Sequence, residues 1–260
     1  MNRGAIVEQY MQFQDKKIVL TGASIDGFGG SLALCFAKLG AELYISTRTL
    51  EKAQTTAAAV QARVPAARIH AFEVNTSSLN DIKAYASAVQ KMTGHIDILI
   101  NNASYWLAGD ISTGSDEDIA ETINSTVTGV IYTTKYFLPL LKNSTCPDII
   151  NMNGSPALPG LIHATAHEAF AAAKAAQATF MNYLRERHRG SGLRICSIFP
   201  SNFKNISAFD EAAWNTPKAA GSTANDYLTA RNVFAAIQFA LSQDRICSID
   251  QIVLSNNSPV

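Results

Sequence analysis

The stretch Lys17–Gly30, KIVLTGASIDGFGG, constrains the fold most strongly. A short apolar run ends in Thr-Gly, passes through small residues and opens into the helical pattern SLALCFAKLG. This order predicts a strand, a glycine-rich turn and a helix. The N-terminus of such a helix offers unpaired N–H groups and a partial positive charge, which suit a pyrophosphate. We expect Gly22, Gly27 and Gly29 to permit the tight turn and close backbone approach to a ligand, with Ser24 as a further contact.

Strand and helix patterns alternate along the 260 residues, without an internal repeat or a linker. They predict one α/β domain over residues 1–260, a Rossmann-type doubly wound, mostly parallel sheet of seven strands flanked by helices. The expected strands cover 17–21, 42–47, 68–74, 96–100, 148–152, 193–199 and 251–254. The expected helices cover about 29–39, 50–63, 79–92, 116–142, 166–189 and 225–241. Residues 1–15 read as a polar lead-in.

The pattern changes between residues 201 and 224. Turn-forming residues are mixed there with apolar Phe203, Ile206, Phe209 and Trp214. This composition predicts a partly ordered substrate lid over the pocket, and its apolar character points to a hydrophobic substrate.

The charge balance excludes several classes of partner. Lys plus Arg and Asp plus Glu number 21 each, so the net charge is zero, and no basic patch indicates nucleic acid or an anionic membrane. No apolar run approaches the roughly 20 residues of a membrane span, and the N-terminus is too polar for a signal peptide. The four cysteines show neither metal-ligand spacing nor a disulfide framework. We therefore expect a cytoplasmic protein without a metal site.

Ligands of doubly wound sheets bind beyond the carboxyl ends of the strands, so the residues there are the candidates. Arg48 follows the second strand without an acidic neighbour, which favours the 2′-phosphate of NADP over the free ribose of NAD. A solvated loop arginine is the alternative. Asn75 follows the third strand and is a candidate for the adenine edge. Asn102 follows the fourth strand, and Asn153-Gly154-Ser155 follows the fifth.

These pieces resemble the short-chain dehydrogenase/reductase family over nearly the whole chain. The glycine-rich motif TGxxxGxG of that family appears as TGASIDGFG, with one extra residue, and its NNAG motif appears as NNAS at 101–104. The resemblance implies a nicotinamide cofactor, a small-molecule substrate and pairing of subunits through the helices at 116–142 and 166–189. It therefore implies a homodimer or homotetramer.

The resemblance also implies a catalytic Tyr, a Lys four residues later, a Ser at the end of the preceding strand and an Asn on the long helix. Here the matching segment begins at Phe170 and ends at Lys174, and Phe carries no ionisable proton. Ser155 is the candidate for the serine. Thr126 falls at the position of the Asn.

In one interpretation, another residue supplies the proton. His167 lies seven residues before Lys174, about two helical turns away on the same face, where the enoyl-acyl-carrier reductases of this family place their Tyr. The alternative is a solvent-exposed histidine at the start of a helix. Tyr105 could also reach the pocket, although a tyrosine there reads more readily as a pocket wall.

The sequence thus predicts an NADP(H)-dependent oxidoreductase acting on a hydrophobic carbonyl, alcohol or activated C=C substrate. Lys174 would hold the nicotinamide ribose. Conjugate reduction of an activated C=C would tolerate Phe170 better than ketone reduction. Two alternatives stay open. One is a non-redox enzyme (a dehydratase, isomerase or pericyclase) on the same scaffold, and the other is a catalytically silent binding subunit.

Overall fold

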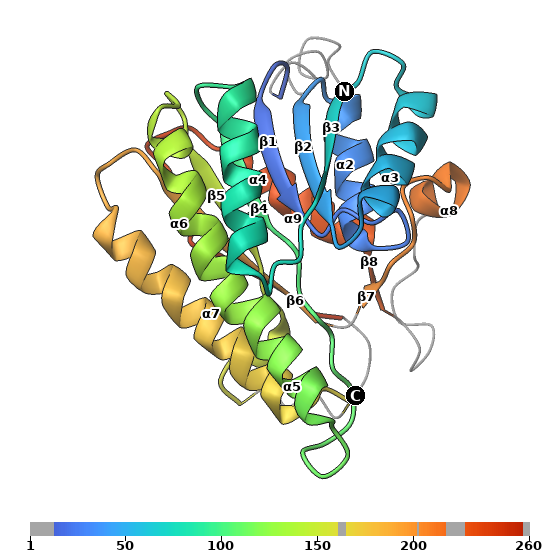
Figure 1. The fold of residues 1–260 in the computed structure, drawn as a ribbon, viewed down its shortest axis with the longest axis vertical. Helices are drawn as coiled ribbons and strands as arrows, with labels where there is room; N and C mark the ends of the chain where they lie inside the picture. Colours follow the sequence, from blue (N-terminus) through green and yellow to red (C-terminus); the bar gives the residue numbers. More distant parts are fainter. Residues whose placement is uncertain (1–12, 161–164, 202, 217–226, 257–260) are drawn as a thin grey trace.

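A sheet of seven parallel strands forms the centre of the protein. The computed structural model describes residues 13–160, 165–201, 203–216 and 227–256. The strands lie in the order β3-β2-β1-β4-β5-β6-β9, of which Figure 1 labels the first six. All neighbours are parallel, and the direction in which successive strands are added reverses after β3, when β4 joins the other side of β1. Their bounds are β1 Lys17–Thr21, β2 Glu42–Thr47, β3 Arg68–Glu73, β4 Ile98–Asn101, β5 Asp148–Met152, β6 Arg194–Pro200 and β9 Gln251–Leu254. This topology confirms the doubly wound fold expected from the alternating pattern.

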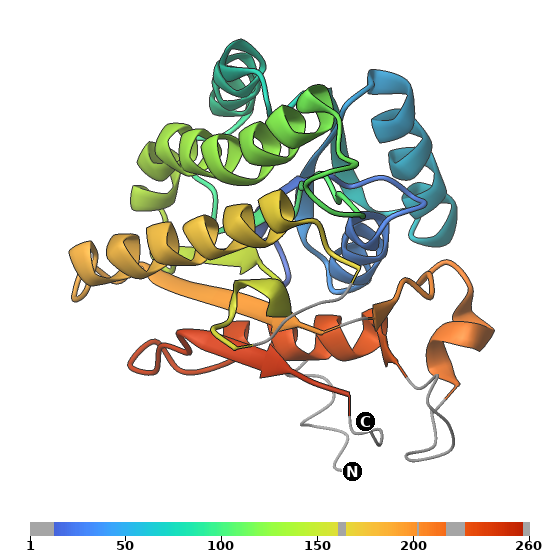
Figure 2. The ribbon, with the colours of Figure 1, turned by 90° about the horizontal axis from the view of Figure 1, so that it is seen from below.

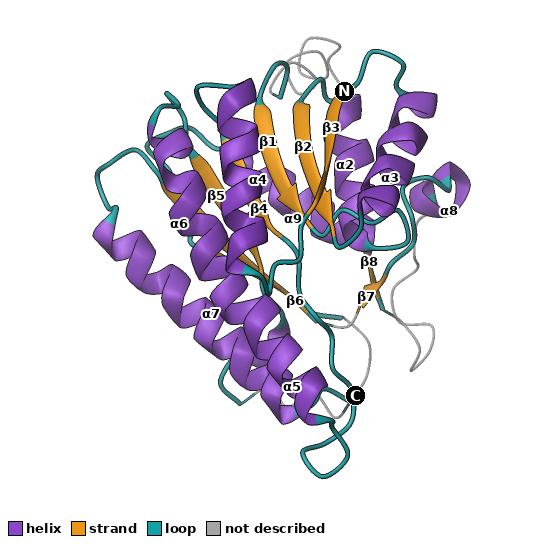
Figure 3. Cartoon of the chain, in the orientation of Figure 1, coloured by secondary structure: helices purple, strands orange, loops and turns teal. Residues whose placement is uncertain are grey.

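Helices connect the strands (Figure 3). Side chains of Thr49, Ser78 and Ser115 accept hydrogen bonds from the first turns of α3, α4 and α5, which explains where these helices start. Within the described ranges, no helix combines the length and apolar character that crossing a bilayer requires. The helix bounds are α2 Phe28–Lys38, α3 Leu50–Arg63, α4 Leu79–Met92, α5 Asp116–Ile123, α6 Gly129–Lys142, α7 Glu168–Arg187, α8 Glu211–Asn215 and α9 Ala230–Leu241.

The sheet separates two apolar cores because successive strand residues point to opposite faces. Ile18 and Leu20 of β1 pack with α2, α3 and α9, whereas Val19 between them packs with α4, α6 and α7. Figure 2 shows these two helical layers with the sheet between them. The strands are therefore nearly continuous in apolar residues, as expected for a buried parallel sheet.

The helix expected over 116–142 is continuous, but its middle is not α-helical. A π-helical segment, η1 at Asn124–Thr128, separates α5 from α6. Two hydroxyls bond back to the helix backbone there: Ser125 Oγ donates to Glu121 O and Thr128 Oγ1 donates to Asn124 O. Such bonds compete with the regular ladder of a helix, and π-helical turns often mark functional sites.

Residues 1–12 of the expected lead-in lie outside the described ranges. Phe13 is buried and its ring meets that of Phe36 edge-on, with the centroids 5.3 Å apart. The start of the helix expected at 225–241 falls partly on residues 217–226, which lie outside the described ranges, and α9 begins at Ala230.

The segment expected to form a lid is described only in part, over 203–216. It contains β7 Phe203–Lys204, which pairs with β8 Leu228–Thr229, and the short helix α8. Phe209 and Trp214 pack against the core on the α2 side of the sheet, and the Arg63 guanidinium lies 5.2 Å from the centre of the Phe209 ring. Phe209 and Trp214 thus contribute to the core, and neither lines the cavity described next.

Candidate functional site

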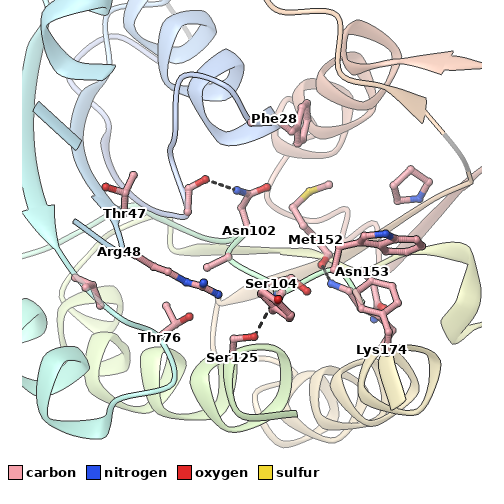
Figure 4. A pocket seen from close by; sticks show the side chains of 18 residues that line it. Phe28, Thr47, Arg48, Thr76, Asn102, Ser104, Ser125, Met152, Asn153 and Lys174 are labelled. Atoms are coloured by element: carbon pink, nitrogen blue, oxygen red, sulfur yellow. Dashed lines mark hydrogen bonds between the residues drawn. The ribbon is translucent and has the colours of Figure 1, made fainter. Parts of the chain in front are cut away.

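A cavity of about 580 Å³ lies where β1, β2, β4, β5 and β6 end. Its wall combines residues that follow these strands with two side chains of α7 (Figure 4). Gly22 follows β1, Arg48 follows β2, Asn102 follows β4, Asn153 follows β5 and Pro200 ends β6. The cavity therefore occupies the crevice at which the order of the strands reverses, where ligands of such sheets bind.

The glycine-rich turn is packed against the end of β4. Gly22 has φ +68°, and a Cβ there would lie 2.8 Å from Ala103 Cα. A Cβ on Gly29 would lie 2.2 Å from Gly22 O, so both positions require glycine for internal packing. Gly27 differs, because it caps α2 without a side-chain hydrogen bond and the nearest protein atom to an added Cβ is 3.5 Å away. Glycine at 27 therefore keeps the helix N-terminus bare toward the cavity.

Ser24 does not line the cavity. Its carbonyl accepts hydrogen bonds from the N–H groups of Gly27 and Gly30, which closes the loop before α2. Asp26 is exposed in this loop, and its carbonyl accepts a hydrogen bond from Asn205 Nδ2 at 2.9 Å. Ser24 thus shapes the turn from within, and the Asp26 carboxylate lies outside the cavity wall.

Asn102 holds the glycine-rich turn in place. Its Nδ2 donates to Thr21 O and Gly22 O at 3.1 and 3.0 Å, and its N–H donates to Thr21 Oγ1. The side chain also faces the cavity, as Figure 4 shows. Asn102 therefore lines the cavity, and its hydrogen bonds go to Thr21 and Gly22 of the glycine-rich turn.

Arg48 reaches across the cavity toward α5. Its Nη2 donates to Glu121 Oε1 at 2.8 Å, and its guanidinium lies 5.1 Å from the centre of the Tyr105 ring. The Tyr105 ring is held in place because its hydroxyl donates to Asp118 Oδ1 at 2.7 Å. Glu121 has a second partner, because Ser77 Oγ donates to its Oε2. The arginine expected to meet a phosphate is thus already paired with a carboxylate 73 residues away in sequence, which no local pattern indicates.

Asn75 turns away from the cavity, contrary to the expected adenine contact. Its Oδ1 accepts from Ser77 N, and its N–H donates to Asp81 Oδ2 at 3.1 Å. These bonds form the turn that leads into α4. Its neighbours Val74 and Thr76 line the cavity instead.

Lys174 of α7 is buried in the cavity wall, with 3 % of its surface exposed. Its Nζ donates to Met152 O at 2.9 Å and to Gln177 Oε1 at 3.2 Å, and Gln177 Nε2 donates to Asn151 Oδ1. Burial lowers the pKa of Lys174 from 10.5 to about 7, because the desolvated ammonium is disfavoured. The lysine is therefore available in both its charged and neutral forms near neutral pH.

Phe170 lies one helical turn before Lys174 and faces the same cavity. Its ring meets Trp106 edge-on with the centroids 4.6 Å apart, and Lys174 Nζ lies 5.6 Å from its centre. Trp106 was not anticipated from the sequence. Its position two residues after the NNAS motif is the signal that could have identified it. The two rings give this end of the cavity an apolar surface.

Asn153, and not Ser155, lines the cavity after β5. Both Oδ1 and Nδ2 of Asn153 are buried and have no hydrogen-bond partner in the described part of the chain. Gly154 follows in an extended conformation and leads into a single 3₁₀ turn, η2 at Ser155–Ala157, which buries Ser155 outside the cavity wall. Unpaired buried amide groups are costly, so Asn153 is suited to bind a polar ligand.

His167 is buried at the start of α7 and does not line the cavity. Its Nδ1 accepts from Ala169 N at 3.0 Å, its backbone N–H donates to Leu107 O, and a Cβ on Gly114 would lie 2.6 Å from Nε2. It is therefore a helix cap enclosed by the 103–115 loop. Two positions were expected for His167 from the sequence, one facing the pocket and one exposed to solvent. The structure shows neither.

At the position expected for the helix asparagine, Thr126 is buried in the π-helical segment. Its Oγ1 lies 2.9 Å from Ser104 Oγ, so it ties α5 and η1 to the end of β4. Its neighbour Ser125 lines the cavity.

Comparisons with known proteins agree with this architecture. The chain is 30% identical over 195 residues to the meso-2,3-butanediol dehydrogenase of Serratia marcescens, which covers 75% of this chain and 74% of that enzyme. The alcohol dehydrogenase of Thermococcus sibiricus, complexed with 5-hydroxy-NADP, superposes with a TM-score of 0.77 at 18% identity, covering 93% of this chain and 96% of its own. A metagenomic short-chain oxidoreductase in complex with NADP gives a TM-score of 0.74 at 19% identity, covering 96% and 99%. These two structures share its fold.

The family model for short chain dehydrogenases matches residues 16–215, which include the glycine-rich turn, Arg48, Asn102, Phe170 and Lys174. This range runs from the first strand of the sheet to the end of α8. It contains every described residue that lines the cavity. The chain is a member of the short chain dehydrogenase family.

Proposed function

We propose that this chain is an NADP(H)-dependent oxidoreductase acting on a hydrophobic carbonyl, alcohol or activated C=C substrate. The observation that carries the proposal is the convergence of a bare helix N-terminus at Gly27, a cation at Arg48 and the buried Lys174 on one cavity. Two proteins of the same fold are described as complexed with NADP or 5-hydroxy-NADP, which supports this choice of cofactor.

The residues of the cavity fit such a nucleotide in three ways. Gly27 leaves space and N–H groups for a pyrophosphate at the start of α2. Arg48 is the charged side chain that immediately follows β2, where a 2′-phosphate would be bound, and no acidic residue stands beside it in the sequence. The unpaired Asn153 amide and the Lys174 amine supply polar groups for the ribose and nicotinamide end.

A bound nicotinamide supplies or accepts a hydride, so the protein must orient the substrate and manage one proton. We assign Phe170 to the position that carries a Tyr in typical members, which leaves no phenol to exchange that proton. His167 is enclosed outside the wall, so Lys174 is the titratable group of α7 that reaches the cavity. We therefore propose Lys174 as the altered proton donor in place of His167.

The apolar end of the cavity suggests the substrate class. Phe170, Trp106, Met152 and Pro200 line it together. A hydrophobic substrate would displace water from these side chains and place its reacting carbon near Lys174. Reduction of an activated C=C needs less acid assistance than ketone reduction, so it suits this wall best.

A titration with NADPH and NADH, followed by nicotinamide fluorescence and calorimetry, tests the proposal. We expect micromolar or tighter binding of NADPH and much weaker binding of NADH, followed by oxidation of NADPH with enones or ketones. Failure of both nucleotides to bind would overturn the assignment.

We further infer a cytoplasmic homodimer or homotetramer that does not act on nucleic acids. α7 packs beside α5 and presents exposed small side chains at Ala172, Ala175 and Ala176, which allow a helix of another subunit to approach closely. The overall charge of zero supports a small-molecule substrate.

A further inference from the structure

The amine of Lys174 is bound in an unusual way for a buried lysine. Its two hydrogen-bond acceptors, Met152 O and Gln177 Oε1, are both neutral. Among the residues that the structure describes, no carboxylate forms an ion pair with Nζ, and burial is the single cause that lowers its pKa. A buried ammonium without a counter-charge is costly, so the site stabilises the neutral amine.

The hydrogen bonds also match the neutral form geometrically. A neutral amine has two N–H donors and one lone pair, whereas an ammonium has three donors. Met152 O and Gln177 Oε1 accept two donors. Because Lys174 is part of the cavity wall, the remaining position on Nζ is the one that a cavity ligand can meet. In the neutral form that position is a lone pair, which is the nucleophilic part of the group.

The surroundings of Nζ favour an apolar reaction partner. The Phe170 ring centre lies 5.6 Å away and Trp106 packs against that ring. Neither ring carries a negative charge that would neutralise an ammonium, although the face of the Phe170 ring lies within cation–π range of Nζ, and neither ring competes as a nucleophile. Apolar walls also limit water, which would otherwise hydrolyse a condensation product.

We propose that Lys174 is a nucleophilic amine that condenses with an apolar or aromatic aldehyde or ketone in this cavity to form an imine. The proposal concerns the same cavity as the proposed oxidoreductase activity but does not require the nucleotide. It gives this member of the family a covalent route for capturing carbonyl compounds. Lysines desolvated in apolar pockets serve as nucleophiles of this kind.

The reaction balances without an oxidant or reductant. The Nζ lone pair forms a bond to the carbonyl carbon, and the C=O electron pair moves to oxygen, which takes one amine proton. The second amine proton then leaves with this hydroxyl group as water while the C=N bond forms. Amine plus carbonyl compound therefore gives imine plus water.

Reductive trapping tests the proposal directly. The purified full-length protein, freed of nucleotide, is incubated at pH 7 with benzaldehyde and sodium cyanoborohydride, which converts an imine into a stable benzylamine. Intact mass and peptide mapping then locate the label. We expect Lys174 to be labelled about tenfold or more faster than any surface lysine, because surface amines are almost fully protonated at this pH.

Two variants serve as controls. Lys91→Met removes an exposed lysine of α4 and should leave the rate of labelling unchanged, whereas Lys174→Met should abolish the fast label. If Lys174→Met does not fold, the peptide map of the unaltered protein decides alone. An unlabelled Lys174 peptide, or fast labelling that persists in Lys174→Met, would overturn the proposal.

Adding NADPH separates this inference from the proposed function. Tight NADPH binding, together with no labelling of Lys174 in the nucleotide-free protein, would refute the imine proposal and leave the oxidoreductase proposal intact. Fast labelling of Lys174 without binding of either nucleotide would support the imine proposal and refute the oxidoreductase proposal. Protection of Lys174 by NADPH would support both, because the nucleotide would then cover the reactive amine.

Discussion

Nη2 of Arg48 donates to Oε1 of Glu121 at 2.8 Å, so the cation that follows β2 is bound to a carboxylate of α5. A 2′-phosphate approaching Arg48 would compete with this carboxylate and be repelled by it. The Arg48 side chain is 54% exposed, so the pair contributes modestly and can exchange for a ligand. Glu121 does not itself line the cavity, so we expect it to act on the proposed NADP site through Arg48.

Replacing Glu121 with Gln should therefore strengthen NADPH binding. We expect the Kd for NADPH to fall by up to about fivefold, the effect of a partly exposed ion pair, while that for NADH stays constant. Calorimetric titration of both nucleotides provides the measurement. Glu117→Gln, which removes an exposed acid of the same helix, is the matched control. Weaker NADPH binding in Glu121→Gln would instead show that Glu121 holds Arg48 in its productive position.

Two glycines of the same turn should respond in opposite ways to alanine. A Cβ on Gly29 would lie 2.2 Å from Gly22 O, so Gly29→Ala should destabilise the fold by more than about 2 kcal/mol. A Cβ on Gly27 meets no protein atom closer than 3.5 Å, so Gly27→Ala should keep the Tm but weaken nucleotide binding at least tenfold. Thermal unfolding and NADPH titration of both variants check this contrast. Unimpaired binding by Gly27→Ala would exclude a pyrophosphate at this helix end.

The buried amine of Lys174 should make stability depend on pH in a specific window. Its pKa of about 7 in the folded protein lies below the ordinary 10.5, so the unfolded chain binds more protons between these values. The contribution of Lys174 to the free energy of unfolding therefore rises as the pH increases from 7 to 10.5 and is lowest below pH 7. The slope approaches about 1.4 kcal/mol per pH unit.

Lys174→Met removes this dependence. At pH 6 we expect the variant to have a larger free energy of unfolding than the unaltered protein, because no ammonium is buried. This gain is reduced by about 1 kcal/mol for each of the two acceptors that loses its donor. This advantage should shrink steadily as the pH rises from 7 to 9. Urea unfolding across this range measures the difference, with Lys91→Met as a control that should show none. A constant difference would indicate that Lys174 remains charged in the fold.

The fold was predictable because its determinants are local. Apolar runs such as those ending at Gly22 and Asn101 mark the strands, and capping residues such as Thr49 and Ser78 stand before some of the helical patterns. The resulting alternation permits few topologies. The cavity residues Gly22, Arg48 and Asn102 also follow from this reasoning, since the ends of parallel strands converge, whereas Lys174 of α7 was expected from the family resemblance.

The remaining site residues depend on contacts that sequence spacing does not encode. Asn153 faces the cavity and Ser155 does not, because a 3₁₀ turn directly after β5 decides which side chain points inward. His167 is enclosed because residues 107 and 167 join through a backbone hydrogen bond across 60 positions of sequence. The Asn75 side chain is engaged in the turn before α4, where its Oδ1 accepts a hydrogen bond from Ser77 N.

The exposed face of α7 predicts self-association. Tyr183 is 74% exposed on this helix, on which small alanines also face outward. Burying this face in a subunit interface would remove apolar area from water, so we expect a dimer or tetramer by light scattering at micromolar concentration. Tyr183→Asp would place a charge in such an interface and should shift the mass toward the monomer. A monomeric mass for the unaltered protein would contradict the predicted assembly.

Restoring a phenol beside Lys174 should change the chemistry that the cavity supports. The Phe170 ring lies 5.6 Å from Nζ, so in Phe170→Tyr an ionisable hydroxyl would enter the same pocket, and a charged Lys174 would lower its pKa. We expect the rate of NADPH-dependent ketone reduction to rise about a hundredfold, the usual contribution of a positioned acid, with a smaller change for enones. Phe170→Leu, which alters the packing on Trp106 without adding an acid, should not raise ketone reduction. Equal ketone reduction by the unaltered protein and Phe170→Tyr would mean that the proton already comes from elsewhere, with the Lys174 amine as the group to test next.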